Sequence, residues 1–255
     1  MRQITSISNP LIKELRSLRE KKYREKYGRY LVEGEKVVQE ALDSPVLIAA
    51  VVTSQPELPV VLHAESLGLD VVEVPRAVLE QIGDTKTPPN VMACLQKSTI
   101  ELPPDGSFYV IADGVSDPKN LGTIIRTADA AGSDGVVLSA DCADPYGPKC
   151  QRAAMGSTLH LGVEVRDVAQ FLREFRGDGG TVVSGLLEGS DSLENTFSRA
   201  CVVVGNESRG VSECVRSLTD IAYRIPIYGR CDSLNVAVAA GIMMYDIRRR
   251  LEQRS

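Results

Sequence analysis

The strongest constraint on the fold is a series of short β-branched runs that give way to loops rich in Gly, Asn and Ser. Phe108-Tyr-Val-Ile-Ala112 and Cys201-Val-Val-Val-Gly205 are two of these runs. Runs of this kind are typical of strands that are buried on both faces of a parallel sheet. Because ligands of α/β proteins bind where such strands end, the loops that follow are candidate site loops. The sequence therefore predicts an α/β domain with a mostly parallel sheet.

The elements expected in this domain alternate between strand and helix. The expected strands are Phe108 to Ala112, Val136 to Ser139, Thr181 to Leu187, Cys201 to Gly205 and Ala222 to Ile227. The expected helices run from about Asn120 to Ala131 before Gly132, from Val168 to Phe175, from Val211 to Leu218, and from Ser233 to about Gln253. Asp232 or Ser233 is a plausible N-cap for the last helix, which is apolar nearly all round. Such a helix is buried in the core or against another subunit, and its small residues 237–241 suit either arrangement.

A second, smaller α/β domain is expected before this one. Helical periodicity in the first forty residues surrounds a short strand at Arg29 to Gly34. Strand-like runs follow at Ile48 to Thr53, Val71 to Val74 and Val91 to Gln96. Paired prolines and an Asp-Gly then suit an exposed connection. We predict domains at 1–97 and 108–255 that are joined by a linker at 98–107.

The charge distribution matters more than the net charge of −5. Residues 1–40 hold ten Lys or Arg against six Asp or Glu. Eight of the cations are Lys13, Arg16, Arg19, Lys21, Lys22, Arg24, Lys26 and Arg29. Phosphate binding needs only such a local positive surface, not a basic protein. The alternative is a solvated helix face on which Glu14, Glu20 and Glu25 pair with the cations.

Several function classes are disfavoured. Gly205 and Gly210 are spaced as in a P-loop, but Val-Ser follows instead of Lys-Ser or Lys-Thr, and no G-x-G-x-x-G follows a strand. The six cysteines form no C-x-x-C pair and the two histidines are far apart, so no metal site is expected. No apolar run has the length of a membrane span or a secretory signal, so we expect a cytoplasmic protein without membrane contact.

One arginine stands in an apolar setting. Arg126 lies six residues after Asn120 on the helix expected at 120–131, among Ile124, Ile125 and Ala128. An arginine in these surroundings is expected to have an anionic partner. Taken singly, this residue favours a structural salt bridge with an acid elsewhere in the chain.

The order and spacing of three motifs resemble those of a known family. Asn120, Gly122, Arg126, Ala128 and Gly132 fit N-x-G-x-x-x-R-x-A-x-x-x-G, and G-N-E-x-x-G then follows at 205–210. I-P-x-x-G at 225–229 precedes S-L-N-V at 233–236. Together they are similar to the motifs of the SpoU (TrmH-like) RNA ribose 2′-O-methyltransferases of the SPOUT superfamily. Segments 146–149 and 152–157 also resemble that family, and Tyr30 to Glu35 resembles its N-terminal substrate-binding domain, which is similar to ribosomal protein L30e.

The resemblance implies a homodimer whose catalytic domain contains a deep trefoil knot and binds S-adenosylmethionine. The implied cofactor-binding residues are Gly205, Asn206, Glu207, Gly210, Ile225, Ile227, Gly229, Ser233, Leu234 and Val236. The implied catalytic residues are Arg126, Asn120, Ser233 and Asn235. The RNA-contacting residues would be Lys13, Arg16, Arg19, Lys21, Lys22, Arg24, Arg29 and Arg152. Arg126 of one subunit would act beside the cofactor bound by the other.

The residues are consistent with methyl transfer to a ribose 2′-hydroxyl. His63 and His160 lie outside the motifs, so a histidine base is not expected. Arg126 is the family's proposed activator, but a guanidinium gives up its proton with great difficulty. Clamping the RNA phosphate next to the ribose is a milder role. The L30e-like domain favours ribosomal over transfer RNA. A non-catalytic RNA-binding assembly factor and a ribosome-protecting resistance methyltransferase are the alternatives.

Overall fold

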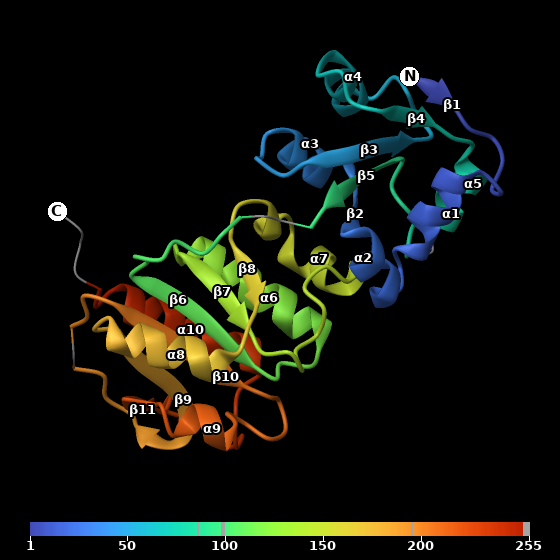
Figure 1. Cartoon of the computed structure of the whole chain (residues 1–255). Coiled ribbons are helices and arrows are strands. Elements are labelled where there is room, and N and C mark those ends of the chain that lie inside the picture. Colours follow the sequence, from blue (N-terminus) through green and yellow to red (C-terminus); the bar gives the residue numbers. More distant parts are fainter. Residues whose placement is uncertain (86, 98–99, 195, 252–255) are drawn as a thin grey trace. The chain divides into compact units, whose positions relative to one another are not determined.

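The computed structural model describes residues 1–85, 87–97, 100–194 and 196–251, and the chain divides into two compact units (Figure 1). Unit 1 comprises Met1–Thr99 and Tyr146–His160, and unit 2 comprises Ile100–Pro145 and Leu161–Ser255. The division differs from the contiguous boundaries that the sequence predicts, because residues 146–160 group with the first unit. The part of the expected linker that is described, 100–107, groups with the second unit.

Unit 1 is built on a mixed five-stranded sheet. Its strand order is β1 (Arg2–Gln3), β4 (Val71–Glu73), β3 (Ile48–Thr53), β5 (Val91–Gln96) and β2 (Arg29–Glu33). β5 runs antiparallel to both of its neighbours, whereas β1, β4 and β3 are mutually parallel. Strands β2, β3, β4 and β5 lie where the sequence predicts them.

Helices cover both faces of this sheet. α1 (Pro10–Ser17) and α5 (Arg76–Ile82) pack on one face, and α3 (Glu35–Leu42) and α4 (Pro59–Ser66) pack on the other. α2 (Lys21–Tyr27) lies between α1 and β2 in the chain. The segment 146–160 contains α7 (Pro148–Ala154) and a short 3₁₀ helix (Ser157–Leu159). It adds Tyr146 and Leu159 to the core beneath α3 and α4, which explains why it groups with this unit.

Unit 2 contains a six-stranded sheet in which every described pairing is parallel. The order is β11 (Ile221–Tyr223), β9 (Thr181–Ser190), β10 (Ala200–Gly205), β6 (Phe108–Asp113), β7 (Gly135–Leu138) and β8 (Val163–Val165). The prediction of a mostly parallel sheet is confirmed. β8 was not predicted, because its three residues are too short to leave a periodic signal.

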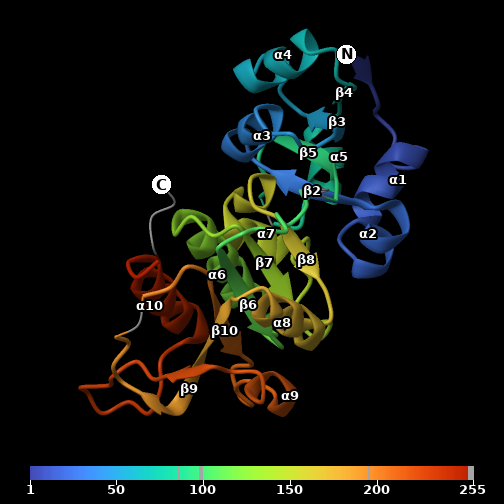
Figure 2. The same cartoon turned by 60° about the vertical axis from the view of Figure 1, so that its left-hand side comes forward.

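Helices also cover both faces of the second sheet (Figures 1 and 2). α8 (Val168–Gly177) and α9 (Glu213–Arg216) share one core with the side chains of Tyr109 and Ile111 on β6. α6 (Pro118–Ala130) and α10 (Val236–Arg248) lie side by side on the other face. A Cβ on Gly241 of α10 would contact Thr127 of α6 at 3.5 Å. Gly241 therefore serves packing within one chain.

Two expected boundaries near the C-terminus are wrong. β11 ends at Tyr223, not at Ile227, and the chain is irregular from there to α10. Pro226 lacks a backbone donor, so it does not extend a strand inside a sheet. α10 begins at Val236 and not at Ser233, because Asn235 is the N-cap: its side-chain oxygen accepts from the amides of Ala237 (2.9 Å) and Val238 (3.4 Å).

Within the described residues, no helix combines the length and the apolar character needed to cross a membrane. The same residues contain no cluster of three or more His, Cys, Asp or Glu side chains that could hold a metal ion.

Candidate active site

A cavity of unit 2 has a volume of about 920 Å³ and opens at the end of β10, beside the second half of β9. Its walls come from four segments that are far apart in the sequence: 185–187, 204–210, 223–228 and 232–236. Asp191, together with Ala239 and Met243 of α10, completes the lining. The carboxyl ends of parallel strands thus carry the cavity, as expected for an α/β protein.

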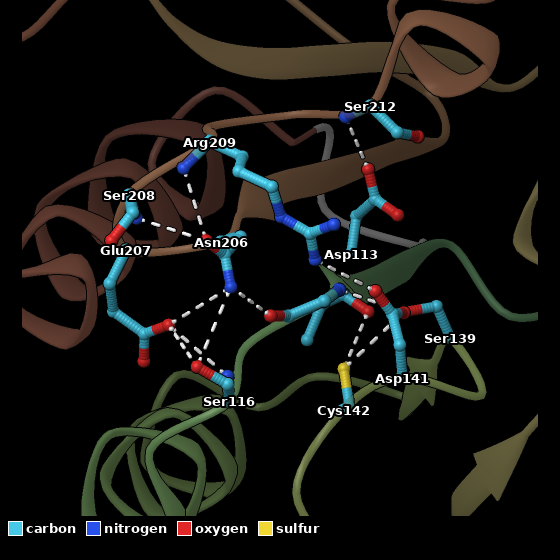
Figure 3. Close-up of polar contacts among 12 residues, drawn as sticks. Asp113, Ser116, Ser139, Asp141, Cys142, Asn206, Glu207, Ser208, Arg209 and Ser212 are labelled. Atoms are coloured by element: carbon cyan, nitrogen blue, oxygen red, sulfur yellow. Dashed lines mark hydrogen bonds and ion pairs between the residues drawn. The ribbon is translucent and has the colours of Figure 1, made fainter.

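The loop after β10 is a tight turn whose shape depends on glycine. Asn206 and Gly210 exchange two backbone hydrogen bonds of 2.9 Å. The Asn206 side-chain oxygen accepts from the backbone amides of Ser208 and Arg209, both at 3.0 Å (Figure 3). Gly210 has φ of +70°, and a Cβ on Gly205 would lie 2.2 Å from the carbonyl carbon of Gly210. Only glycine therefore fits at 205 without moving the loop.

Glu207 joins this loop to the segment before α6. One carboxylate oxygen accepts from the backbone amide (3.1 Å) and the hydroxyl (3.0 Å) of Ser116 (Figure 3). The other accepts from the amide of Asp117 (3.1 Å) and from the side chain of Asn120 (3.0 Å). Partial burial of the carboxylate raises its pKa, but these hydrogen bonds outweigh that effect and lower the pKa of Glu207 to about 2. The side chain is therefore ionised at neutral pH.

Asn120 also reaches the third motif. Its side-chain oxygen accepts from the Asn235 side-chain amide at 3.0 Å. Glu207, Asn120 and Asn235 consequently form a continuous hydrogen-bonded row that contains one residue from each of the three motifs. The Asn206 side-chain amide also donates to the carbonyl of Gly114 at 2.7 Å, which holds the loop after β10 against the end of β6.

Arg126 lies apart from this row. It is exposed on α6, and no described residue offers it a hydrogen bond or an ion pair. The expectation of a structural salt bridge within the chain is therefore wrong over the part of the chain described. Arg126 also does not line the cavity. The guanidinium is free to meet an anion from another molecule.

The remaining expected site residues are distributed as follows. Every expected cofactor-binding residue lines the cavity except Gly229: Gly205, Asn206, Glu207, Gly210, Ile225, Ile227, Ser233, Leu234 and Val236. Ser233 is exposed at the lining. Asn235 lines the cavity as well, while Asn120 does not.

Sequence reasoning missed the residues that brace these loops. Asp113 accepts a 2.7 Å bond from the backbone amide of Ser212, and Asp141 forms a 3.2 Å ion pair with Arg209 (Figure 3). Asp117 caps α6. The Ser-Asp-Pro sequence at 116–118 is a recognisable helix start that could have located this cap. The partners of Asp113 and Asp141 are 99 and 68 residues away, and no local pattern reveals them.

The basic residues expected to contact RNA fall into two groups. Arg24 does not fit the expectation of an RNA contact, because it is buried. Its guanidinium donates to the carbonyls of Leu18 (2.6 Å) and Arg19 (2.8 Å), and it therefore stabilises the end of α1. Arg19 is half-buried and donates to the Ile82 and Gly83 carbonyls. The others remain at the surface, several of them beside acids: Lys13, Arg16, Lys21 with Glu25, Lys22 with Glu20, Arg29 with Glu14, and Arg152 with Asp84.

The cavity suits a nucleoside that carries a positive charge. Leu186, Ile225 and Leu234 give it apolar walls, and the loops that line it present backbone groups beside them. Asp191, Glu207 and Asp232 also line it, and Arg224 is its one lining cation among the described residues. Apolar walls with a few placed polar groups fit an adenine ring, and carboxylates favour a sulfonium cation. These residues therefore fit S-adenosylmethionine.

Comparison with known proteins gives matches to both units. The model of the SpoU rRNA Methylase family matches residues 107–245, and that of the MRM3-like substrate binding domain matches residues 9–93. The chain is 36% identical over 251 residues to the 23S rRNA (guanosine(2553)-2′-O)-methyltransferase RlmP of Bacillus subtilis, which covers 97% of this chain and 100% of that protein.

Solved structures agree with these matches. The AdoMet-bound rRNA methyltransferase from Sinorhizobium meliloti superposes with a TM-score of 0.87 and 35% identity over 98% of each chain. The SpoU methyltransferase AviRb from Streptomyces viridochromogenes, in complex with AdoMet, superposes with a TM-score of 0.85 and 25% identity. The match covers 94% of this chain and 97% of that one. The parallel sheet, the cavity and these matches define an S-adenosylmethionine-dependent RNA 2′-O-ribose methyltransferase. Within that class, the chain belongs to the SpoU rRNA methylase family.

Proposed function

We propose that this enzyme methylates a ribose 2′-hydroxyl of 23S ribosomal RNA. The observation that carries the proposal is the end-to-end match to the Bacillus subtilis 23S rRNA methyltransferase, which includes the substrate-binding domain as well as the catalytic one. Substrate choice depends on both domains, so a match to the catalytic domain alone would not support it. The guanosine named for that relative is the first nucleotide to examine.

The residues of the chain have to align a ribose hydroxyl and manage its proton. When bound, S-adenosylmethionine supplies a methyl group on a sulfonium. A weak nucleophile such as a ribose hydroxyl then gains most from being held in line with that methyl group. We assign this alignment to Asn120, whose orientation is fixed by Glu207 on one side and Asn235 on the other. Ser233 contacts the substrate or the cofactor from the exposed lining.

Arg126 is assigned to the RNA phosphate beside the target ribose. A guanidinium keeps its proton throughout the physiological pH range, so it is a poor general base but a strong, bidentate phosphate ligand. The absence of an acidic partner among the described residues supports an external anion as its partner. With the phosphate clamped, its oxygen can accept the proton of the neighbouring hydroxyl.

We infer that the active unit is a homodimer. α10 leaves an apolar stripe exposed at a spacing of four and three residues, with Val238 at 53%, Ile242 at 39% and Tyr245 at 44%. This stripe lies on the helix next to α6, which carries Arg126. Because Arg126 does not line the cavity of its own chain, a role in methyl transfer is best met at the cavity of a second chain. The same reasoning makes the site incomplete in a monomer.

We also propose the trefoil knot of the SPOUT superfamily and a place in the cytoplasm. The loops that follow β10 and β11 line one cavity although the chain passes through α9 and β11 between them. This convergence supports a chain that crosses itself here. Ribosomal RNA as the substrate supports the cytoplasm as the compartment.

The proposed function is tested by mapping ribose methylation in 23S rRNA from cells with and without this protein. We expect one 2′-O-methyl mark to disappear on deletion and to return with the wild-type protein but not with Arg126→Ala. In vitro, transfer of a labelled methyl group to unmodified 23S rRNA should need S-adenosylmethionine and this protein alone. An unchanged methylation map, together with no transfer in vitro, would reject 23S rRNA as the substrate.

A further inference from the structure

Unit 1 contains a second pocket, of about 320 Å³, that the methyl-transfer site does not use. Its floor and walls are apolar and come from Leu18, Leu31, Val37 and Ile82. The segment 146–155 closes it with Tyr146, Pro148 and Met155. All these residues belong to the same compact unit. The volume is in the range of small-ligand pockets and well above the space that a water molecule needs.

Met155 is unusual in two ways. It has φ of +51°, and it is the one residue other than glycine with positive φ in the described chain. Its side chain is also apolar and exposed, at 44%. A large unbranched residue gains nothing from a left-handed backbone, and Gly156 follows at φ of +94°. Met155 caps the C-terminus of α7, where its backbone amide donates to the Gln151 carbonyl at 3.1 Å, and a left-handed residue commonly ends a helix in this way. At this helix end Met155 contributes an apolar side chain to the pocket lining.

The polar groups of the pocket form a rim. Arg152 on α7 and Asp84 after α5 form a 3.0 Å ion pair, with side-chain exposures of 40% and 31%. Glu33 accepts a 2.9 Å bond from the backbone amide of Asp84, which holds this loop at the edge of the pocket. An exposed pair of this kind contributes little to stability, so a phosphate can replace Asp84 at the guanidinium with little loss. These residues therefore offer a donor and acceptors beside a mostly apolar interior.

We propose that this pocket takes one unpaired nucleobase of the RNA substrate, with Arg152 on the adjacent phosphate. The inference rests on the proposed function, because it needs an RNA substrate. Sequence-specific RNA recognition mostly targets splayed single-stranded bases that pack against aromatic or apolar side chains and are read at their edges. Met155 and the edge of Tyr146, whose ring also packs on Tyr30 and Lys97, provide apolar surface, and Glu33 and Asp84 provide acceptors for a base edge. The pocket lies within the segment that matches a substrate-binding domain, 9–93, together with residues 146–155.

The first test removes the apolar wall without adding strain. In Met155→Asn, asparagine tolerates a left-handed backbone, so the fold should be kept and the melting temperature should not fall. Val37→Phe fills the half-buried interior instead. We expect each variant to raise the KM for 23S rRNA fragments about tenfold, the effect of losing one packed base. The kcat at saturating RNA and the calorimetric Kd for S-adenosylmethionine should stay at wild-type values.

Matched controls isolate the pocket. Leu67→Asn removes an exposed apolar side chain (53%) of the same unit outside the pocket and should leave the KM unchanged. Arg152→Ala should raise the KM and reduce its salt dependence, whereas Arg2→Ala, which breaks an exposed pair with Asp70, should do neither. A merely structural role for Arg152 would lower the melting temperature without changing the salt dependence.

Three outcomes would overturn the proposal. The first is a wild-type KM in both Met155→Asn and Val37→Phe, with both variants folded. The second is saturable binding of free ribonucleosides in the pocket, followed by NMR, that RNA does not displace, since this would make it a small-molecule site. The third is loss of self-association in the Val37→Phe variant, which would make the occupant a second copy. None of these affects the proposed function, which fails only if the wild-type protein does not methylate 23S rRNA.

Discussion

The side-chain amide of Asn235 donates to the side-chain oxygen of Asn120 across 115 residues of sequence, at 3.0 Å. The same Asn235 side chain caps α10 through its oxygen, so both of its polar atoms are engaged. The side-chain amide of Asn120 in turn donates a hydrogen bond to the Glu207 carboxylate. The start of α10, the start of α6 and the loop after β10 are thereby fixed relative to one another. A substitution at any of these three residues should therefore shift the positions of the other two side chains.

The first prediction separates the cap from this link. Asn235→Ala removes both, and loss of an N-cap costs about 1 kcal/mol of unfolding free energy, or about 2–4 °C in melting temperature for a chain of this size. Asn235→Ser keeps a capping oxygen but is too short to reach Asn120, so it should restore most of the stability. Both variants should bind S-adenosylmethionine more weakly, as measured by calorimetry. If the serine variant bound as tightly as wild type, the link would have no part in shaping the cavity.

The second prediction concerns the carboxylate of Glu207. Its pKa is lowered to about 2, because the hydrogen bonds from Asn120 and from residues 116–117 outweigh the effect of burial. A depressed pKa stabilises the folded state above the unfolded value of about 4.3, and this contribution is lost as the pH falls towards 2. The Glu207→Gln variant has no ionisable group at this position, so its stability lacks this pH dependence. The melting-temperature difference between wild type and Glu207→Gln should therefore be constant from pH 7 to about 5 and shrink between about 4.5 and 2.

The comparison is made by thermal unfolding of both proteins at each pH, so that the titration of all other carboxylates cancels. A difference that stayed constant down to pH 2 would mean that the hydrogen bonds to Glu207 do not favour its charged form.

The sequence predicted the strands of unit 2 well because a strand buried on both faces is apolar throughout, as in Cys201 to Gly205. It also identified part of the cavity lining, since the motif resemblance covers 205–210 and 225–236, but it missed the lining residues of β9 and α10. It failed where structure depends on contacts between distant residues. The N-cap of α10 was expected at 232 or 233, but Asn235 takes that position beside Asn120, whose place in space no local pattern gives.

Charge patterns were the least reliable guide. Arg24 lies in the same basic stretch of sequence as the surface cations, yet it is buried at 4% exposure on the carbonyls that end α1. The sequence does not show that α1 ends at Ser17 and that its last carbonyls need donors. Similarly, the sequence assigns residues 146–160 to the catalytic domain, since they lie between its motifs. Their place in unit 1 depends on the packing of Tyr146 and Leu159, which no local pattern shows.

The third prediction compares Gly205 of the second motif with Gly229 of the third. In Gly205→Ala the new methyl group would lie 2.2 Å from backbone atoms of Gly210 and Val211. The backbone must shift, so we expect a loss of about 1–3 kcal/mol in unfolding free energy and loss of S-adenosylmethionine binding. Gly229→Ala is the control, because nothing lies within 4 Å of its added Cβ. Thermal unfolding and calorimetry should find Gly229→Ala close to wild type; equal damage in both would show that crowding at 205 is not the cause.

The fourth prediction concerns the apolar stripe on α10. Ile242→Arg places a charge at a position that is already 39% exposed in the single chain, so the fold should survive. If the stripe is the subunit interface, sedimentation should change from dimer to monomer, and methyl transfer should fall with it. Leu62→Arg, on an exposed position (53%) of α4, should leave both unchanged. A wild-type protein that sediments as a monomer and is fully active would exclude the dimeric site.

The last prediction tests where Arg126 acts. It is exposed and has no partner in the described part of its own chain, so Arg126→Ala should not change the melting temperature. It should keep S-adenosylmethionine binding and lower kcat by about 100-fold, an effect that misplacement of the reacting groups can produce. Thr123→Ala, one turn earlier on the exposed side of α6, should stay active.

Mixed dimers then decide between one chain and two. Leu234→Arg puts a positive charge into the cavity lining and should prevent binding of a sulfonium cofactor, while its Arg126 stays intact. If Arg126 serves the cavity of the partner, a dimer of Arg126→Ala with Leu234→Arg has one complete site, formed by the first chain's cavity and the second chain's arginine. Equal mixing of the two inactive variants should then restore about a quarter of wild-type activity, because half of the dimers are mixed and each has one working site. No recovery, with mixed dimers present by native mass spectrometry, would mean that Arg126 acts within its own chain.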